Sequence, residues 1–371
     1  MNTLLHFLTS LFIPTFPGAA VAGNLLKHGI ETTLFDINKD ANVPEALRKA
    51  NVLEGAVWAN SAREAAEASD VVLTALPRPE HVSAAFAGDD GILAGISPGM
   101  TWIEHSTTDF LNTLQLKSAV EAKGAHCVEA PFTGGMQILR EGKMVTLCGA
   151  QPEVLERVED LIALSAPRIV RCGEFGHATV IKIWSNVLCA AMDVHIGECL
   201  ASCKKAGLDL QLVFDAMRVS SGNSFCWETE VPIMLQDNFD PIFTSKMMLK
   251  DIDLTLDLTE RHGVATPLTN LIKQRYIDAI EKFGEDSGSS IPAKLAEGES
   301  DCEFSTVPSV NEAFKDWSYT SEFVNGSYNI VHQGYDNVYL REPFTKHSPV
   351  ESEVETLRAR VKELEEALAK K

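Results

Sequence analysis

The chain has 371 residues, more than one compact core usually holds, so we expect two domains and an appendage. A net charge of −20 disfavours nucleic acid and anionic membranes as partners, while 45% hydrophobic and 23% charged residues are ordinary for a globular protein. The 8 cysteines form no CxxC pair and the 10 histidines form no metal-binding motif, so we predict no metal ion.

The first residues bear on where the protein resides. Residues 1–26 contain no charged side chain, and the Ala-Val-Ala at 20–22 resembles a signal-peptidase site. However, no Lys or Arg precedes the apolar run, and Pro14 and Pro17 interrupt it, which is atypical of a signal peptide. No later stretch reads as long and apolar enough to span a membrane. We therefore expect a protein of the cytoplasm or of an organellar matrix (mitochondrion or plastid).

Short apolar runs alternate with amphipathic segments in the first half of the chain. A helix is expected to begin after Ser61, with Ser61 as its N-cap and Glu64 completing a capping box. Strands are expected at 32–37, 69–77, 100–107, 126–132 and 144–150. This alternation is typical of a mostly parallel sheet. We predict an α/β Rossmann-like domain over residues 1–168.

Helical periodicity dominates after residue 173. One long helix is expected from about His177 until Gly207 ends it, and residues 210–285 keep apolar positions three and four apart. We predict an all-α domain over 169–295, with residues 284–301 as a loop or as the end of that domain.

The last segment, 296–371, is predicted to be an extension. Residues 300–350 are aromatic and polar without clear periodicity. The final stretch forms an a/d seam of apolar residues: Val354, Leu357, Val361, Leu364 and Leu368. The seam is short, so a coiled coil and a helix packed on its own subunit both remain open.

The stretch 16–38 reads as the first helix and second strand of a dinucleotide-binding unit. Gly18 would open a helix whose N-terminus favours a pyrophosphate, because free N–H groups and the helix dipole attract anions. Asp36 ends the next strand, where a carboxylate accepts hydrogen bonds from a ribose 2′-OH and repels a 2′-phosphate. Such an Asp also occurs simply as a turn residue, so both interpretations of Asp36 stand.

The turn before that helix departs from the usual glycine-rich pattern. The first strand must come from residues 4–14, and Ile13 and Thr15 stand where glycines are normal. Pro14 removes an N–H donor, and a side chain at Thr15 crowds the space near a pyrophosphate. We predict weakened cofactor binding unless residues 1–16 are a working replacement.

Lys182, Ser185 and Asn186 lie at i, i+3 and i+4 of the long predicted helix, hence on one face. Together they could bind a carbonyl or hydroxyl oxygen and a carboxylate. Burial beside Ile181 and Ile183 would lower the pKa of the lysine. Taken alone, the same pattern fits a surface lysine on an amphipathic helix.

Three motifs follow predicted strand ends, where an open parallel sheet binds its ligands. They are "LPRPEHV" (76–82), "EHSTTD" (104–109) and "EAPFTGG" (129–135). Hydroxyls and glycines there let side chains and backbone N–H groups approach an anion. Individually, they also fit helix caps and an ordinary glycine turn.

Together the motifs resemble the β-hydroxyacid dehydrogenases of the 3-hydroxyisobutyrate dehydrogenase type, relatives of 6-phosphogluconate dehydrogenase. The family's D-A-P-V-S-G-G resembles "EAPFTGG", its D-x-S-T resembles "EHST", and its G-x-G-x-x-x-K-x-x-N-N resembles "GHATVIKIWSN" (176–186). Its K-D-L resembles "KDI" (250–252), and its G-x-x-D-x-S-A resembles "FGEDSGSS" (283–290). The resemblance covers roughly residues 17–292.

The resemblance implies an NAD(P)-dependent oxidoreductase that interconverts a small β-hydroxy acid and its semialdehyde. The implied catalytic residues are Lys182, as acid/base, and Asn186. The implied substrate-binding residues are Ser106, Thr107, Thr133, Gly134 and Gly135. The implied cofactor-binding residues are Gly18, Asp36, Leu76, Pro77, Thr107 and Lys250. Asp36 favours NAD, with NADP still open, and the family implies a homo-oligomer.

This sequence departs from the family pattern at a few positions. Ser185 replaces an Asn, Ala178 a Gly and Thr133 a Ser, all small changes that leave Lys182 in place. The missing glycines at 13 and 15 support an alternative function. In this alternative, the chain is a non-catalytic binding or scaffold protein that keeps the fold without tight cofactor binding.

Overall fold

The computed structural model describes residues 8–12, 16–38, 52–133, 143–239, 243–305, 318–324 and 327–333. The chain divides into two compact units. The first unit comprises Met1–Val194 and Asp240–Pro292, and the second comprises His195–Phe239 and Ala293–Lys371. The domain boundaries after residues 168 and 295 stay predictions.

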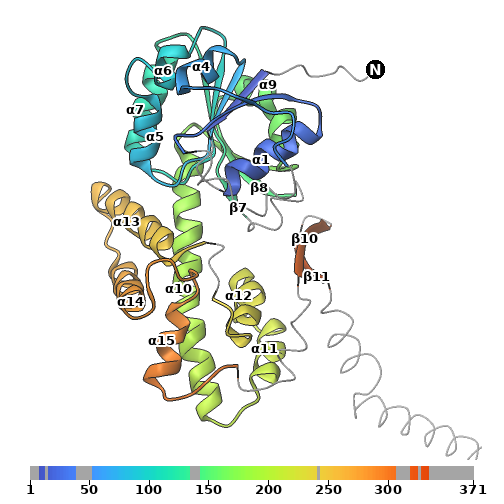
Figure 1. The fold of residues 1–371 in the computed structure, drawn as a ribbon. Coiled ribbons are helices and arrows are strands. Elements are labelled where there is room, and N and C mark those ends of the chain that lie inside the picture. Colours follow the sequence, from blue (N-terminus) through green and yellow to red (C-terminus); the bar gives the residue numbers. More distant parts are fainter. Residues whose placement is uncertain are drawn as a thin grey trace, which may run out of the picture. The chain divides into compact units, whose positions relative to one another are not determined.

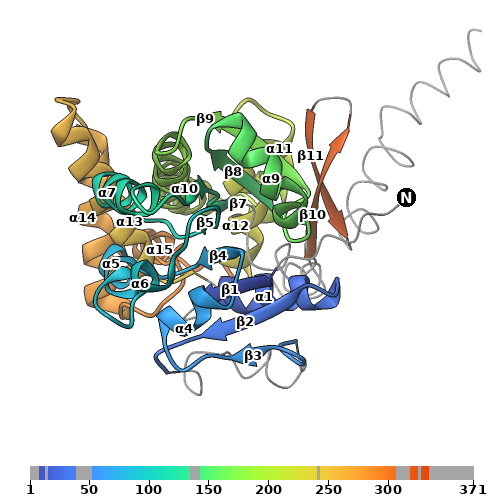
Figure 2. The same cartoon turned by 90° about the horizontal axis from the view of Figure 1, so that it is seen from above.

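The first unit is built on a mostly parallel sheet. Its strands are β1 (Leu8–Phe12), β2 (Glu31–Phe35), β3 (Val57–Trp58), β4 (Val71–Thr74), β5 (Thr101–Glu104), β6 (His126–Glu129), β7 (Phe132–Thr133), β8 (Val145–Gly149) and β9 (Arg168–Gly173). Their order is β3-β2-β1-β4-β5-β6-β8-β7, with β9 pairing β8 (Figure 2). Strands β3 to β6 run parallel in that order, which confirms the predicted sheet.

The N-terminal segment supplies an inner strand of the sheet. Strand β1 pairs in parallel with β2 on one side and β4 on the other, with Leu11 opposite both Leu34 and Leu73. A strand was predicted within 4–14, and β1 confirms it. The sheet order reverses between β1 and β4, the point at which such sheets bind dinucleotides. Residues 13–15, which the sequence predicts to form the atypical turn, lie outside the described residues.

Strand β9 was not predicted. It pairs in parallel with β8 and so extends the sheet beyond residue 168. Its side chains are half-buried or exposed, and it carries Arg168 and Arg171. Charged side chains are typical of edge strands, and they hide the apolar pattern by which a buried strand is recognised.

Helices cover both faces of this sheet. They are α1 (Phe16–Lys27), α4 (Ala62–Glu67), α5 (Pro79–Phe86), α6 (Ile92–Gly95), α7 (Phe110–Glu121) and α9 (Pro152–Ala163). Helices α4 to α7 lie on one face, and α1 and α9 lie on the other (Figure 1). Trp102, fully buried under the first group, packs edge-on against Phe86 with ring centroids 4.7 Å apart. Burying one large apolar side chain of this kind stabilises the folded state by about 1.5 to 3 kcal/mol, because its surface is removed from water.

The predicted N-cap of α4 is present. The Glu64 backbone N–H donates to Oγ of Ser61 at 3.0 Å. The Glu64 carboxylate accepts from the backbone N–H of Asn60 at 2.7 Å, one residue before the partner that a standard capping box uses.

Helix α10 (His177–Lys205) is the predicted long helix. It starts in the first unit and continues into the second from His195. Gly207 follows its last turn with a φ of +81°, a conformation that glycine adopts without a Cβ penalty. By length and composition α10 could cross a membrane, which corrects the expectation that no stretch could. Core helices of globular proteins pass the same test.

Two further helices complete the first unit, namely α13 (Ser245–Arg261) and α14 (Pro267–Phe283). The motif at 283–290 anchors the start of α13, because the Ser245 N–H donates to the Ser287 carbonyl and the Ser289 N–H donates to the Phe243 carbonyl, both at 2.8 Å. Tyr276 of α14 donates to the Ser289 carbonyl at 2.7 Å.

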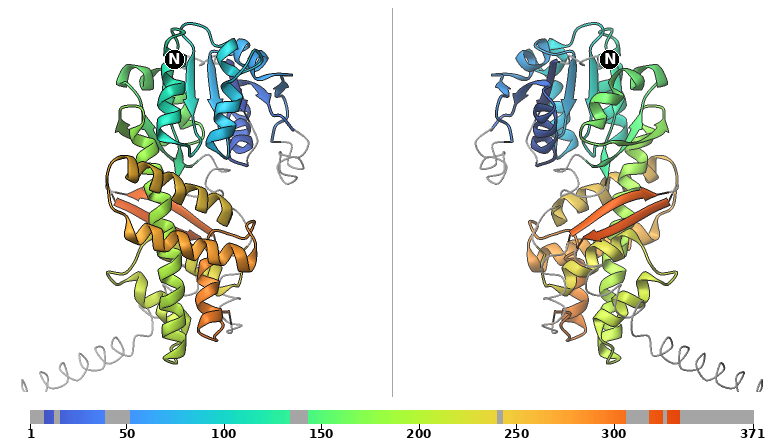
Figure 3. Two further views of the ribbon diagram at one scale, coloured as in Figure 1. Left: turned by 90° about the vertical axis from the view of Figure 1, so that its left-hand side faces the viewer. Right: turned by 90° about the vertical axis from the view of Figure 1, so that its right-hand side faces the viewer.

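The second unit contains α11 (Leu210–Arg218), α12 (Phe225–Leu235), most of α15 (Pro292–Glu299), β10 (Ser318–Val324) and β11 (Ser327–Gln333). Helix α15 shows that the segment at 284–301 ends the helical region rather than forming only a loop. Strands β10 and β11 pair antiparallel, with Val324 opposite Ser327 (Figure 3). These two strands were not predicted, because the sequence of 300–350 shows no clear periodicity. The heptad seam at 354–368 lies outside the described residues.

Candidate active site

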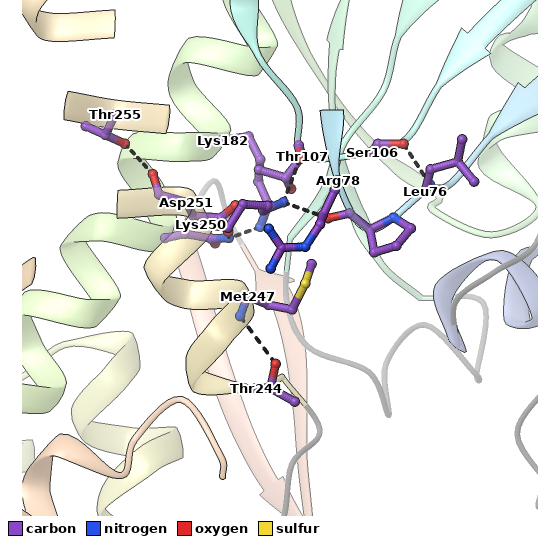
Figure 4. A network of polar contacts seen from close by, with 12 residues as sticks. Leu76, Arg78, Ser106, Thr107, Lys182, Thr244, Met247, Lys250, Asp251 and Thr255 are labelled. Atoms are coloured by element: carbon purple, nitrogen blue, oxygen red, sulfur yellow. Dashed lines mark hydrogen bonds and ion pairs between the residues drawn. The ribbon is translucent and has the colours of Figure 1, made fainter. Parts of the chain in front are cut away.

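Side chains from two helices meet the strand ends of the sheet in the first unit. Helix α10 contributes Lys182 and Asn186, α13 contributes Lys250 and Asp251, and the segments after β4 and β5 face them (Figure 4). The predicted motifs therefore converge at the carboxyl ends of the parallel strands, as this type of sheet requires of its ligand sites.

Lys182 is buried and held by its neighbour on the same helix face. Its side chain is 9% exposed, and Nζ donates to Oδ1 of Asn186 at 2.8 Å. Burial lowers the pKa of Lys182, Lys250 nearby lowers it further, and the charge of Asp251 acts in the opposite direction. The interpretation of Lys182 as a surface lysine is thus excluded by its burial.

Asn186 connects Lys182 to a buried carboxylate. Its Nδ2 donates to Oδ2 of Asp251 at 2.6 Å, and Asp251 is 0% exposed. The other oxygen, Oδ1, forms an ion pair with Nζ of Lys250 at 3.0 Å. A continuous polar chain thus runs from Lys182 through Asn186 and Asp251 to Lys250.

Lys250 links α13 to the segments that follow β4 and β5. Its Nζ donates to the Thr107 carbonyl at 2.7 Å and to the Pro77 carbonyl at 3.1 Å, in addition to the ion pair with Asp251. Two of the three N–H donors of this ammonium group are therefore taken by carbonyls, and its charge is paired with Asp251. Among the described residues, Asn186 is the one hydrogen-bond partner of Nζ of Lys182. The two lysines therefore differ in their capacity to bind a ligand.

The segments after β4 and β5 are fixed to each other by Ser106. Its Oγ accepts from the Leu76 N–H at 2.8 Å, and its own N–H donates to Oε1 of Glu104 at 2.6 Å. Burial raises the pKa of Glu104 to about 7. Ser106 is itself buried, whereas Thr107 is partly exposed.

Glu129, at the end of β6, caps the N-terminus of α10. Its Oε1 accepts from the N–H groups of Gly176 at 2.7 Å and Ala178 at 2.6 Å. Its Oε2 accepts from the N–H of Thr179 at 3.2 Å and from the Thr179 hydroxyl at 2.6 Å. A carboxylate suits this place because the first N–H groups of a helix lack partners within the helix. The contacts fix the start of the helix that carries Lys182.

His105 links the two substrate motifs. Its Nδ1 donates to the Ala130 carbonyl at 2.6 Å, and its ring stacks on Phe132 with centroids 4.3 Å apart. Burial lowers the pKa of His105 to about 4, so the ring is neutral. Thr133 follows in β7 and is partly exposed. Gly134 and Gly135 lie outside the described residues.

The cofactor residues predicted near the N-terminus take the positions that a dinucleotide fold requires. Gly18 is buried in the first turn of α1, and Asp36 follows the last residue of β2. Oδ1 of Asp36 accepts from the Asn38 N–H at 2.6 Å, the turn contact expected of such an Asp. The end of the second strand is also the place from which an Asp contacts a ribose in such folds. Strand, helix and carboxylate therefore fit NAD or NADP.

Some residues at the site were missed by sequence reasoning. Asp251 follows Lys250 directly and Arg78 follows Pro77, so adjacency was the available signal. Figure 4 shows the side chain of Arg78 directed toward Lys182 and Lys250. Within the described part of the chain, no group of three or more His, Cys, Asp or Glu is placed to hold a metal ion.

Comparisons with known proteins agree with this geometry. Residues 17–173 match the family model for the NAD-binding domain of 6-phosphogluconate dehydrogenase, and residues 176–296 match the NAD-binding model of NADP-dependent 3-hydroxyisobutyrate dehydrogenase. These two matches place the chain among the NAD(P)-dependent oxidoreductases.

Two relatives come from Pseudomonas aeruginosa. An NAD-dependent L-serine dehydrogenase is 30% identical over 287 residues, 75% of this chain and 94% of that protein. A 3-hydroxyisobutyrate dehydrogenase is 29% identical over 278 residues, 73% of this chain and 91% of that protein.

Among solved structures, 3-hydroxyisobutyrate dehydrogenase from Mycobacterium tuberculosis with L-serine has a TM-score of 0.70 at 23% identity. It covers 78% of this chain and 99% of its own, and supports the fold. The chain belongs to the β-hydroxyacid dehydrogenase family of the 3-hydroxyisobutyrate dehydrogenase type. It is an NAD(P)-dependent hydroxyacid dehydrogenase acting on CH–OH, and the non-catalytic alternative is not supported.

Proposed function

We propose that Lys182 is the acid/base of this dehydrogenase and that the substrate is a small β-hydroxy acid or its semialdehyde. The observation that carries the assignment is the contrast between the two buried lysines. Nζ of Lys250 is engaged by two carbonyls and Asp251, whereas Nζ of Lys182 bonds Asn186 alone among the described residues. Lys182 therefore has donors left for a substrate oxygen.

Burial lowers the pKa of Lys182, which makes its ammonium form a better proton donor than an ordinary lysine. In oxidation, neutral Lys182 takes the proton from the substrate hydroxyl, and in reduction, protonated Lys182 returns a proton to the carbonyl oxygen. Bound NAD(P) supplies the hydride acceptor or donor. Because the lysine is buried, water competes poorly for this proton transfer.

Substrate orientation is assigned to the motifs at the strand ends. Asn186 would hold the reacting end of the substrate, Ser106 and Thr107 would lie beside it, and Thr133 with Gly134 and Gly135 would bind the carboxylate. The charges favour an anion, because Asp251 is the one carboxylate in the polar chain that joins Lys182 and Lys250. Arg78 is directed toward the two lysines and is paired with Glu80 at 3.8 Å.

The named substrates of the two Pseudomonas relatives share a chemistry. L-Serine and 3-hydroxyisobutyrate each carry a primary alcohol on the carbon next to the one that bears the carboxylate. We propose the same unit, HO–CH₂–CH–COO⁻, as the substrate core here.

A substrate panel tests this function. The panel contains 3-hydroxyisobutyrate, L-serine and other small hydroxy acids with NAD and NADP, and semialdehydes with NADH and NADPH. Lys182→Ala should lower turnover by at least about 100-fold while cofactor affinity stays nearly intact. Turnover retained by Lys182→Ala would refute the acid/base assignment.

We also propose that NAD is preferred over NADP, on the position of Asp36 after β2. NADH should bind more tightly than NADPH. The variant Asp36→Ala should bring the two dissociation constants closer together. Tighter binding of NADPH by the unaltered chain would refute the preference.

Finally, we propose that the chain forms homo-oligomers and acts without nucleic-acid or membrane partners in the cytoplasm or an organellar matrix. Support for self-association comes from exposed apolar side chains on α10 and α14: Ile181, Leu188, Leu268 and Leu271. Light scattering should give a mass of at least twice the 40.5 kDa of one chain. A monomer across the concentrations used for assays would contradict the proposal.

A further inference from the structure

Asp251 is a fully buried carboxylate between the two lysines, and none of the roles above belongs to it. Its side chain is 0% exposed, and both of its oxygens contact site residues, Asn186 at 2.6 Å and Lys250 at 3.0 Å. Its backbone carbonyl accepts from the Thr255 hydroxyl at 2.9 Å within α13. Burying a carboxylate is costly unless charged and hydrogen-bonding partners compensate for the lost water. Asp251 has both kinds of partner.

The partners of Asn186 select one orientation of its amide. An ionised carboxylate only accepts hydrogen bonds, and an ammonium group only donates them. With Asp251 on one side and Lys182 on the other, the NH₂ group must face Asp251 and Oδ1 must face Lys182. The reversed amide would set NH₂ against the ammonium group and the carbonyl against the carboxylate.

We propose that Asp251 is a positioning residue that acts through Asn186: it fixes the amide so that Oδ1 holds Nζ of Lys182 and leaves the other N–H donors for the substrate oxygen. This inference rests on the proposed role of Lys182 as acid/base. It assigns the direction of the catalytic lysine to a residue on another helix, since Asp251 lies on α13 and Lys182 on α10.

The charges facing Lys182 give the proposal a measurable consequence. Cys189 lies on its own helix, Lys250 and Asp251 lie on α13, and Arg78 is directed toward it from the segment after β4. Of these, Asp251 raises the pKa of Lys182, while Lys250 lowers it. Removing the Asp251 charge should therefore lower the pKa of Lys182 further.

The variant Asp251→Asn keeps the shape of the side chain and removes its charge. We expect kcat to fall about 10- to 100-fold while the KM for the cofactor stays unchanged. In the reduction direction, Lys182 must be protonated, so the pH at which kcat declines should move down by about one unit. If this variant does not fold, Asp251→Ser is measured in the same way.

Asp253→Asn is the matched control. Asp253 lies on the same helix and pairs with Lys273 at 2.7 Å, with its side chain 48% exposed. We expect Asp253→Asn to leave both kcat and the pH profile unchanged. An equal pH shift in this control would show that any charge on α13 acts in the same way, which would overturn the proposal.

A double-mutant cycle tests the route through Asn186. In an Asn186→Ala background, Asp251→Asn should add little further loss of kcat, because the amide that transmits its effect is gone. Independent, additive losses would overturn the proposal, as would an unmoved pH profile in folded Asp251→Asn.

The same variants separate this inference from the function. Turnover retained by Lys182→Ala refutes the acid/base assignment itself, whatever Asp251→Asn does. An inactive Lys182→Ala combined with an unmoved profile in Asp251→Asn refutes the role of Asp251 alone.

Discussion

Glu104 and Glu129 are buried carboxylates opposite each other on neighbouring strands, and their hydrogen-bond partners differ. Glu129 accepts four hydrogen bonds from the start of α10, whereas Glu104 accepts from the Ser106 N–H and from the side chains of Ser106 and Thr74. Burial raises the pKa of Glu104 to about 7, and the charge of Glu129 adds to the rise. Glu104 therefore exchanges its proton near neutral pH.

This pKa predicts how stability depends on pH. Glu104 has a pKa of about 7 in the folded protein against an ordinary value of 4.5, so protonation favours the folded state. The stability that this proton contributes is complete below pH 4.5 and is lost as pH rises to about 7. Glu104→Gln, which stays neutral, should therefore be more stable than the natural chain at pH 8, by up to ~3 kcal/mol, and similar at pH 4.5.

Thermal unfolding at several pH values checks the Glu104 prediction. Glu156→Gln, on an exposed position of α9, serves as the control and should show no pH-dependent difference. The raised pKa would be contradicted if the difference in melting temperature between Glu104→Gln and the natural chain were the same at pH 4.5 and at pH 8.

At the residue scale, the sequence predicted contacts between side chains that lie on the same face of one helix. Lys182 and Asn186 are four residues apart, so their contact follows from helix geometry. The partners Asp251 and Lys250 come from α13, about 65 residues later, and only the packing of α13 against α10 and the sheet brings them there. Such contacts between distant segments have no periodic signal.

At the element scale, α10 is held by a carboxylate from the sheet rather than by a local cap. Its first N–H groups point at Glu129, which is 0% exposed. Gly149 makes room for this side chain, since a Cβ at that position would lie 2.2 Å from Oε1 of Glu129. The end of β6 and the helix that carries Lys182 are thus joined at one residue.

Removing the Glu129 carboxylate should destabilise the protein strongly. Glu129→Ala leaves three backbone N–H groups and one hydroxyl without their acceptor, which costs about 3 to 5 kcal/mol in free energy of unfolding. Thr179→Val, which removes one of the four donors, should cost about 1 kcal/mol. Denaturant unfolding followed by circular dichroism measures both, and equal stability of Glu129→Ala and the natural chain would refute this account of α10.

The turn between β1 and α1 is the second element that carries a prediction. Strand β1 lies where the strand order of the sheet reverses, yet the sequence at Ile13 and Thr15 lacks the glycines that let the backbone approach a pyrophosphate. The double variant Ile13→Gly with Thr15→Gly should therefore bind NADH several-fold more tightly. Fluorescence titration checks this, and unchanged affinity would show that the natural turn is already competent.

The elements missed in the sequence have physical reasons in common. Strand β9 is an edge strand with charged side chains, and β10 and β11 form a separate two-stranded sheet. Neither shows the continuous apolar run of a buried parallel strand. The Asn325-Gly326 dipeptide between β10 and β11 is a hairpin signal that the sequence does contain.

At the scale of the whole molecule, the order of elements could be predicted and the division into units could not. Alternating strands and helices followed by long helical periods define the Rossmann-like and helical parts, which the relatives confirm. The chain, however, returns from the second unit to the first at Asp240–Pro292, and this return brings α13 to the strand ends. The succession of helices and strands along the sequence does not indicate that a later segment belongs to the first unit.

The central claim is that this chain binds a nicotinamide cofactor and uses it, despite its atypical first turn. The most direct measurement is a titration of the full chain with NADH and NADPH, following nicotinamide fluorescence. We predict saturable binding below millimolar concentration, tighter for NADH, and nearly unchanged in Lys182→Ala. Absence of binding of either nucleotide at millimolar concentration would contradict the account.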